Sequence, residues 1–388
     1  MQIPRDAEAA VIQLDSSRGF GCPQRYIQGP GEFENIFLYA GEYGQKPLFL
    51  IDGGIYPMIS ARILEVQDKA ECAYETFPYS GESCMEAVAE IADQVRSLGC
   101  DLLIGVGGGK VLDTAKLVGD ELDFPRIIVP TAASSDAPAA DWAAIYTRDG
   151  VHLMGRRTRR STELVLVDSE IIVHAPARLF SAGIGDALAT WFEARACERS
   201  RSHNCVAKGY LPTRTALALS RECYDILMHE GIQALRDVKA HVVTPEVEDV
   251  IEANTLLSGL GFINGGLAAA HGLHSGFSEA SGGESSLHGE KVAFALLCQL
   301  VLESATEDAL WELMNFLFAT DLPLTLEQLG IQPTEENLRI IADKTCKRNT
   351  LIHHEPLAVD EDRIRQIVLE ANALGHHYLA DRRKEGVS

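Results

Sequence analysis

Two halves with different hydrophobic periodicity constrain the fold of this 388-residue chain. In the first half, short apolar runs that end at turn residues alternate with amphipathic stretches, as buried parallel strands and their crossover helices do. The clearest predicted strands are Pro47–Asp52, Cys100–Val106, Arg126–Pro130 and Glu163–Asp168, with a helix predicted over Cys84–Leu98. This alternation predicts an α/β layer built on a parallel sheet.

The second half is dominated by helical patterns, and strand-like runs nearly vanish after Arg178. The predicted helices span Gly185–Cys197, Thr213–His229, Glu246–Leu260, Lys291–Ser304, Glu307–Phe318 and Asp360–Leu374. A chain of this length exceeds one typical hydrophobic core. We therefore expect an α/β domain over residues 1–178 and an all-helical domain over residues 179–388.

The charge balance excludes several classes of partner. The chain carries 34 basic and 56 acidic residues, a net charge of −22. A nucleic acid or an anionic membrane requires a basic face, so neither is expected to bind. The one strong basic cluster, Arg156–Arg160 (RRTRR), is expected on a loop with a solvated face.

The cysteines and the apolar runs predict the cellular compartment. The nine cysteines are scattered, odd in number and without a CxxC pair, which is typical of reduced thiols rather than of a disulfide framework. No run approaches the ~18 apolar residues of a membrane span. The N-terminal MQIPRDAEAAVIQ lacks an apolar signal core. These features predict a soluble, cytoplasmic protein.

The segment Gly265–Phe294 places three histidines among small and apolar residues. A spacing of three puts His271 and His274 on one face of a predicted helix. His288 follows a Gly/Ser-rich turn and opens a second apolar helix. Transition-metal sites are often assembled in this way because neutral imidazole is a common ligand, whereas packed core histidines are the alternative.

A carboxylate that would complete such a site occurs in SAGIGDALATWFEARAC. Asp186 lies near the predicted start of an apolar helix, where an Asp is often only an N-terminal cap. With His271 and His288 it makes a set of one carboxylate and two imidazoles. Three protein ligands leave one coordination position open, which is typical of a catalytic metal.

The motif GVGGGKVLDTAK, residues 105–116, follows a predicted strand and opens a predicted helix. Gly107, Gly108 and Gly109 would let the backbone approach a phosphate, and the helix N-terminus favours an anion. Lys110 is not followed by Ser or Thr, so the motif is not the nucleoside-triphosphate P-loop. A tight strand–helix turn is the alternative, but three adjacent glycines favour phosphate binding.

Polar residues also follow two other predicted strands. Asp52 ends one of them, where a carboxylate either caps the strand end or binds an adenosine ribose and repels a 2′-phosphate. This acid lies far ahead of the glycine loop, which indicates a Rossmann-like variant rather than the standard order. Thr131 and Ser134 could bind nicotinamide or phosphate oxygens and Asp136 a polyol hydroxyl, although such clusters also make simple turns.

Together these motifs resemble the glycerol dehydrogenases of the iron-containing/polyol dehydrogenase superfamily, which has the dehydroquinate synthase-like fold. The resemblance runs from YIQGPG at residues 26–31 to the C-terminal helices. It is carried by GVGGGKVLDTAK, PTAASSDAP, GIGDALATWFEARAC, NTLLSGLGFINGGLAAAH and HGEKVAF. It implies NAD in the cleft between an α/β and a helical domain, and a homo-oligomer that is often an octamer.

The resemblance also implies roles for individual residues. It places the metal on Asp186, His271 and His288, and Asp136 on the substrate. The implied cofactor residues are Asp52, Gly107, Gly108, Gly109, Lys110, Asp113, Thr131 and Ser134. His274 would either relay a proton or act in positioning and packing. Thr190 stands where iron-type relatives carry a further His, which favours Zn²⁺, with Fe²⁺ as the alternative.

The expected activity is NAD-linked oxidation of a secondary hydroxyl of a small polyol, from glycerol to dihydroxyacetone or on a close analogue. A phosphorylated polyol is the alternative if Arg156–Arg160 reaches the cleft. A dehydroquinate synthase-like lyase would need several Lys and Arg residues beside the histidines, and no such set is identified. A non-catalytic NAD-binding protein should have lost a metal ligand or the glycine loop, and both are intact. The unusually small loop SEASGGESS is where altered substrate choice would arise.

Overall fold

A computed structural model describes residues 16–67, 72–207, 209–347, 350–384 and 386. Six parallel strands form one sheet in the order β1-β8-β5-β4-β2-β3. Their bounds are β1 (Tyr26–Gly29), β2 (Pro47–Asp52), β3 (Glu75–Tyr79), β4 (Leu102–Gly107), β5 (Arg126–Pro130) and β8 (Leu164–Asp168). The four strands predicted from apolar runs are confirmed. The two missed strands, β1 and β3, are the edge strands, which are only partly buried and therefore carry a weaker apolar signal.

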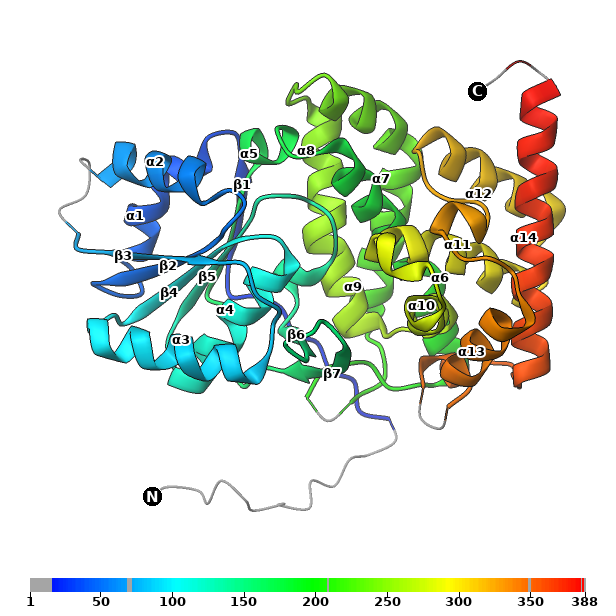
Figure 1. The fold of residues 1–388 in the computed structure, drawn as a ribbon, viewed down its shortest axis with the longest axis horizontal. Coiled ribbons are helices and arrows are strands. Elements are labelled where there is room, and N and C mark those ends of the chain that lie inside the picture. Colours follow the sequence, from blue (N-terminus) through cyan, green and yellow to red (C-terminus); the bar gives the residue numbers. More distant parts are fainter. Residues whose placement is uncertain (1–15, 68–71, 208, 348–349, 385, 387–388) are drawn as a thin grey trace.

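Helices cover both faces of the sheet (Figure 1). They are α1 (Ile36–Ala40), α2 (Tyr56–Gln67), α3 (Met85–Leu98) and α4 (Gly109–Leu122). Successive side chains of a strand point to opposite faces. On β2, Leu48 and Leu50 belong to the core formed with α3 and α4, whereas Phe49 and Ile51 belong to the core formed with α1 and α2. Burial on both faces explains the continuous apolar runs of the central strands.

After β8, every helix or strand named in the described part of the chain is a helix. Its α-helices are α5 (Ser169–Val173), α6 (Ala177–Ser200), α7 (Arg214–Lys239), α8 (Pro245–Glu252), α9 (Ser258–Gly265), α10 (Ala269–Glu279), α11 (His288–Leu302), α12 (Glu307–Ala319), α13 (Glu335–Thr345) and α14 (Glu361–Lys384). Helix α6 is central and packs against α7, α9 and α11. The predicted helical half is confirmed, whereas the domain boundary at residues 178/179, inside the first turn of α6, stays a prediction.

The prediction that the basic run Arg156–Arg160 lies on a loop is wrong for its first two residues. Strands β6 (Trp142–Tyr146) and β7 (His152–Arg157) form an antiparallel hairpin, so that Arg156 and Arg157 lie in a strand. Every guanidinium of the run has a carboxylate partner: the pairs are Arg156–Asp120, Arg157–Asp141, Arg159–Asp120 and Arg160–Glu163. The run therefore holds the hairpin to the α/β layer.

Two further observations concern membrane insertion and the thiols. None of the described helices is long and apolar enough to cross a membrane alone. Residues Pro245–Gly265 and α10 meet that condition only jointly, as a pair bent by 102°. All nine cysteines are free thiols, in agreement with the prediction from their spacing.

Candidate metal centre and cofactor edge

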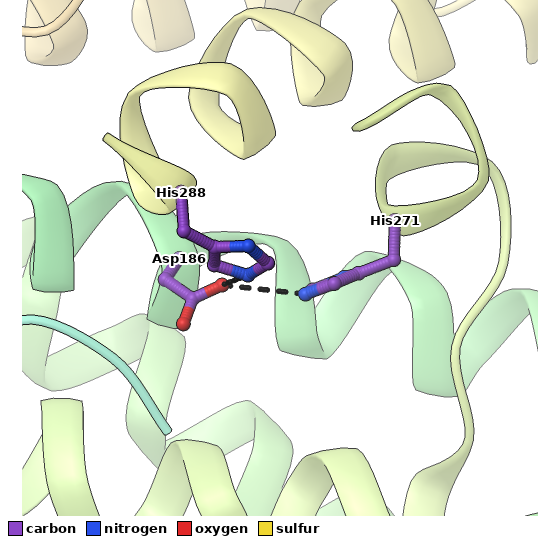
Figure 2. A group of neighbouring side chains, drawn as sticks. All are labelled: Asp186, His271 and His288. Carbon is purple, nitrogen blue, oxygen red and sulfur yellow. Dashed lines mark ion pairs between the residues drawn. The ribbon is translucent and has the colours of Figure 1, made fainter. Parts of the chain in front are cut away.

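The three predicted metal ligands converge from three helices. Asp186 lies in the middle of α6, His271 in the first turn of α10, and His288 is the first residue of α11. Nε2 of His271 and Nε2 of His288 lie 3.3 Å and 3.1 Å from the same atom, Oδ1 of Asp186. Figure 2 shows both imidazoles directed toward one oxygen of this carboxylate. The alternative that Asp186 is an N-terminal cap is wrong, because α6 begins well before it.

The donor atoms fit a divalent cation. Oδ1 of Asp186 is buried and accepts no hydrogen bond from the described residues. A buried carboxylate oxygen without a partner is costly unless a positive charge neutralises it. One carboxylate and two imidazoles, whose ligand atoms lie within 4.8 Å of one another, are typical ligands of Zn²⁺ or Fe²⁺. Only His288 is substantially exposed, at 39% of its side chain, so access to the ligands is from its side.

Close backbone packing brings two of the ligands together. A Cβ atom on Gly289 would lie 1.8 Å from the carbonyl oxygen of Ala182, and one on Gly185 would lie 2.6 Å from the carbonyl oxygen of Gly289. Helices α6 and α11 therefore touch through backbone atoms one residue away from Asp186 and from His288. Side chains larger than hydrogen at these two positions would separate the ligands.

Glu193 orients His271 and was missed in the sequence analysis. Its Oε2 lies 2.6 Å from Nδ1 of His271, and its Oε1 accepts the backbone N–H groups of Ala268 (2.8 Å) and His271 (2.9 Å). A carboxylate at Nδ1 keeps the proton there and leaves the lone pair of Nε2 for a metal. Glu193 follows Asp186 by two helical turns on the same face, and this spacing was a usable signal.

We expect Glu193→Gln to lower the metal affinity by about 10- to 100-fold. The amide N–H₂ can donate to Nδ1 of His271 and thereby move the imidazole proton to Nε2, where it blocks metal binding. Competition with a chelator measures the effect. Glu222→Gln, on the exposed side of α7, is the matched control. Equal metal affinities of the two variants would contradict the role of Glu193.

Asp136 lies beside the candidate metal centre. Its backbone N–H donates to Oδ2 of Asp186 at 3.2 Å. Burial and the charge of Asp186 raise the pKa of Asp136 to about 7. Burial also opposes the ionisation of Asp186, but the neighbouring imidazoles of His288 and His271 hold its pKa well below its usual range. Of two neighbouring acids, Asp186 is therefore the permanent anion.

Two predicted cofactor residues end adjacent strands. Asp52 ends β2 and Gly107 ends β4, and a Cβ atom on Gly107 would lie only 2.8 Å from Cβ of Asp52. The sheet order changes direction here, because β3 lies on one side of β2 whereas β4 and β5 lie on the other. Ligands of open α/β sheets bind outside the carboxyl ends of strands at such a switch point.

The glycine loop fits a phosphate group. A Cβ atom on Gly108 or on Gly109 would meet no atom within 4 Å, so packing inside the chain does not require glycine at either position. No side chain caps the N-terminus of α4, which begins at Gly109. Its first N–H groups therefore remain available to an anion that approaches the bare backbone.

The side chains of Lys110 and Asp113 pair with other residues of this protein. The ammonium of Lys110 pairs with Glu82. The carboxylate of Asp113 accepts the N–H of Ala144 at 2.9 Å and the ammonium of Lys116 at 3.2 Å. Asp113 thus fastens the β6–β7 hairpin to α4, and its predicted role at the dinucleotide stays a prediction.

The loop after β5, which carries Thr131 and Ser134, is held from both sides. The N–H of Thr131 donates to the carbonyl oxygen of Gly107 at 3.1 Å, so this loop lies beside the glycine loop. From the helical half, Nδ2 of Asn254 donates to the carbonyl oxygen of Ala133 at 3.1 Å. Asn254 lies in a π-helical turn, η3 (Ala253–Leu257), and was not predicted from sequence.

Comparison with known proteins relates this chain to the dehydrogenases that its motifs resemble. Residues 23–169 match the family model described as iron-containing alcohol dehydrogenase. The chain is 39% identical to a glycerol dehydrogenase from Pseudomonas putida, covering 93% of this chain and 99% of that one. It is 38% identical to a glycolaldehyde reductase from Halobacterium salinarum, covering 92% and 97%. The solved glycerol dehydrogenase from Schizosaccharomyces pombe superposes with a TM-score of 0.90 at 32% identity, covering 96% and 94%.

Proposed function

The chain belongs to the iron-containing alcohol dehydrogenase family, whose members use NAD and a metal ion, and from this premise we propose that it oxidises a secondary hydroxyl of glycerol or a close analogue. The observation that carries the proposal is the convergence of Asp186, His271 and His288 beside Asp136. We propose Zn²⁺ as the metal because Thr190, one turn after Asp186, offers no nitrogen and bonds Ser258 instead. Fe²⁺ is the alternative.

Separate groups of residues bind the metal, the substrate and the dinucleotide in the proposed reaction. Asp186, His271 and His288 would hold the cation and leave one position open to substrate. When bound there, a divalent cation supplies the Lewis acidity that lowers the pKa of a substrate hydroxyl. Asp136 orients a neighbouring hydroxyl of the polyol. The residues proposed to hold and orient the dinucleotide are Asp52, Gly107, Gly108, Gly109, Lys110, Asp113, Thr131 and Ser134.

His274 is proposed as a positioning residue rather than as a proton relay. Its Nε2 lies 2.9 Å from Nδ1 of His288, on the opposite side of that ring from Asp186. A relay would have to pass a proton through His288, whose Nε2 would hold the metal. Burial lowers the pKa of His274 well below its usual range, which agrees with a neutral hydrogen-bond acceptor.

The alternatives to a neutral polyol lose support. A phosphorylated substrate was the alternative if Arg156–Arg160 reached the cleft, but the guanidinium groups of Arg156, Arg157, Arg159 and Arg160 are paired with carboxylates. The lyase alternative needs several Lys and Arg residues beside the histidines, and the sequence shows no recognisable set of this kind. A non-catalytic protein would not need an intact ligand set. We also propose a cytoplasmic location, supported by nine free thiols, and a homo-oligomer, supported by the family resemblance.

A substrate panel tests the proposal. The metal-loaded protein is given glycerol, propane-1,2-diol, glycerol phosphates and 2-hydroxy acids with NAD or NADP, and NADH absorbance is followed beside metal analysis. We expect one metal per active site and the highest kcat/KM with an uncharged vicinal diol. The absence of NADH formation with every diol would overturn the proposal.

Asp52 should set the preference for NAD over NADP. A carboxylate that binds the ribose hydroxyls repels a 2′-phosphate, and Asp52→Asn removes that repulsion. We expect the ratio of kcat/KM for NAD to that for NADP to fall about tenfold, equivalent to about 1.4 kcal/mol. Asp149→Asn, in an exposed turn, is the control and should not change the ratio. A wild-type preference for NADP would refute the assignment of Asp52.

A further inference from the structure

A chain of polar groups supports His288 from behind and ends at a buried ammonium. Nδ1 of His288 lies 2.9 Å from Nε2 of His274, and Oγ of Ser278 lies 3.3 Å from that same Nε2. Nζ of Lys291 donates to Oγ of Ser278 at 3.0 Å. His274 and Ser278 lie one turn apart on α10, whereas His288 and Lys291 occupy the first turn of α11. These contacts thus join α10 to α11 beside one of the proposed metal ligands, His288.

Lys291 is held in an environment that disfavours its charge. It is only 7% exposed, and within the described residues its ammonium forms no ion pair and donates only to a neutral hydroxyl. Burial lowers its pKa, against the opposing effect of Glu284 and Glu290. The Glu290 carboxylate is already bound by Arg178, at 2.6 Å and 2.8 Å. A buried cation with so little compensation costs stability, and such local costs cluster at functional sites.

The hydrogen-bond partner of Nδ1 differs between His288 and His271. Glu193 accepts directly from Nδ1 of His271, whereas Nδ1 of His288 faces another imidazole, which can either donate or accept a proton. If His274 donated, Nδ1 of His288 would be the acceptor. The proton of a neutral His288 would then lie on Nε2, where it prevents metal binding. The polarity of this histidine pair therefore decides whether His288 can be a ligand.

We propose that Lys291, acting through Ser278, is a positioning residue that sets the hydrogen-bond polarity of the His274–His288 pair. An ammonium can only donate, so Oγ of Ser278 accepts from Lys291 and directs its own proton toward Nε2 of His274. That nitrogen is then unprotonated, and its one lone pair accepts both the Ser278 hydroxyl and, at the shorter distance of 2.9 Å, the Nδ1–H of His288. Nε2 of His288 keeps its lone pair toward Asp186. The inference rests on the proposed function, because it concerns a ligand of the proposed metal.

The opposite effects on metal binding and on stability make the proposal testable. We expect Lys291→Met to lower the affinity for Zn²⁺ by about 10- to 100-fold in competition with a chelator. Thermal unfolding of the metal-free variant should occur at the same or a higher temperature, because an isolated buried charge is removed. A residue with a purely structural role would lower the melting temperature and leave the metal affinity of the folded protein unchanged.

Ser278 variants test the connection. Ser278→Ala should lose a similar factor in Zn²⁺ affinity. The double variant with Lys291→Met should lose no more than either single variant, because both substitutions interrupt the same series of hydrogen bonds. Ser278→Thr retains a hydroxyl and should retain affinity. Lys239→Met is the matched control, because it removes an exposed ammonium that pairs with Asp321 on the surface.

Three results would overturn the inference. They are an unchanged Zn²⁺ affinity of Lys291→Met, losses that multiply in the double variant, and a wild-type protein that binds no divalent metal. Failure of the proposed activity gives a different result: a wild-type protein that binds Zn²⁺ but oxidises no diol. The polarity proposal would then still be decided by the affinity measurements.

Discussion

Asp186→Asn is expected to reduce kcat/KM by about 1,000-fold or more while the protein remains folded. The substitution removes the only anionic ligand and leaves two neutral imidazoles, which hold a divalent cation weakly. The fold should survive because asparagine has the same shape and can still accept the N–H of Asp136 through its carbonyl oxygen. In the metal-free protein, the change also removes a buried carboxylate with an unpartnered oxygen.

Metal content, NADH formation and the melting temperature should be measured on the same preparation of Asp186→Asn. The control is Asp225→Asn on α7, whose carboxylate forms a surface pair with Arg221. This control should bind metal and turn over like the wild type. A metal-free Asp186→Asn enzyme with wild-type turnover would refute the assignment of the metal centre.

Gly289→Ala is expected to cost both stability and metal affinity. The added methyl group would lie 1.8 Å from the carbonyl oxygen of Ala182 and 3.1 Å from the backbone nitrogen of Asp186. Because these are backbone atoms, the clash is relieved only if α11 moves away from α6. Overpacking typically costs about 1–3 kcal/mol, and we expect the upper part of this range. The same movement withdraws His288 from Asp186.

Gly109→Ala separates this effect from a general intolerance of glycine substitution. A methyl group there would meet no atom of the chain within 4 Å, so melting temperature and metal affinity should not change. Binding of NAD should weaken, because the methyl group would occupy the space proposed for a phosphate. A Gly289→Ala variant with the stability and metal affinity of Gly109→Ala would show that the contact between α6 and α11 does not position the ligands.

The central part of the fold was predictable because burial imposes a pattern on sequence. Residues Arg126–Pro130 were predicted with the observed bounds, since β5 is buried on both faces. Edge strands such as β3 (ETFPY) are only partly buried and carry no such pattern. The β6–β7 hairpin escaped prediction for a related reason. Its basic residues are compensated by acids distant in sequence, such as Asp120 and Asp141.

The support of the metal centre was much less predictable than its ligands. Glu193 could have been found from its spacing, because it shares a helix face with Asp186. No spacing rule connects Lys291 to His288 through two residues of another helix. Asn254 reaches the loop after β5 from a π-helical turn that has no recognisable sequence pattern. Such contacts depend on how the helices pack.

The amino-acid sequence alone determined the parallel α/β half, the helical half, and the types of ligand available to a metal and to a phosphate. It could do so because backbone propensity, hydrophobic periodicity and ligand chemistry belong to residues and their local order. Only the tertiary structure decided that Asp186, His271 and His288 meet at one point and which neighbouring groups orient them. It also decided that carboxylates neutralise the charges of Arg156–Arg160. These outcomes depend on the close approach of α6 and α11 at Gly185 and Gly289 and on charges brought together by folding.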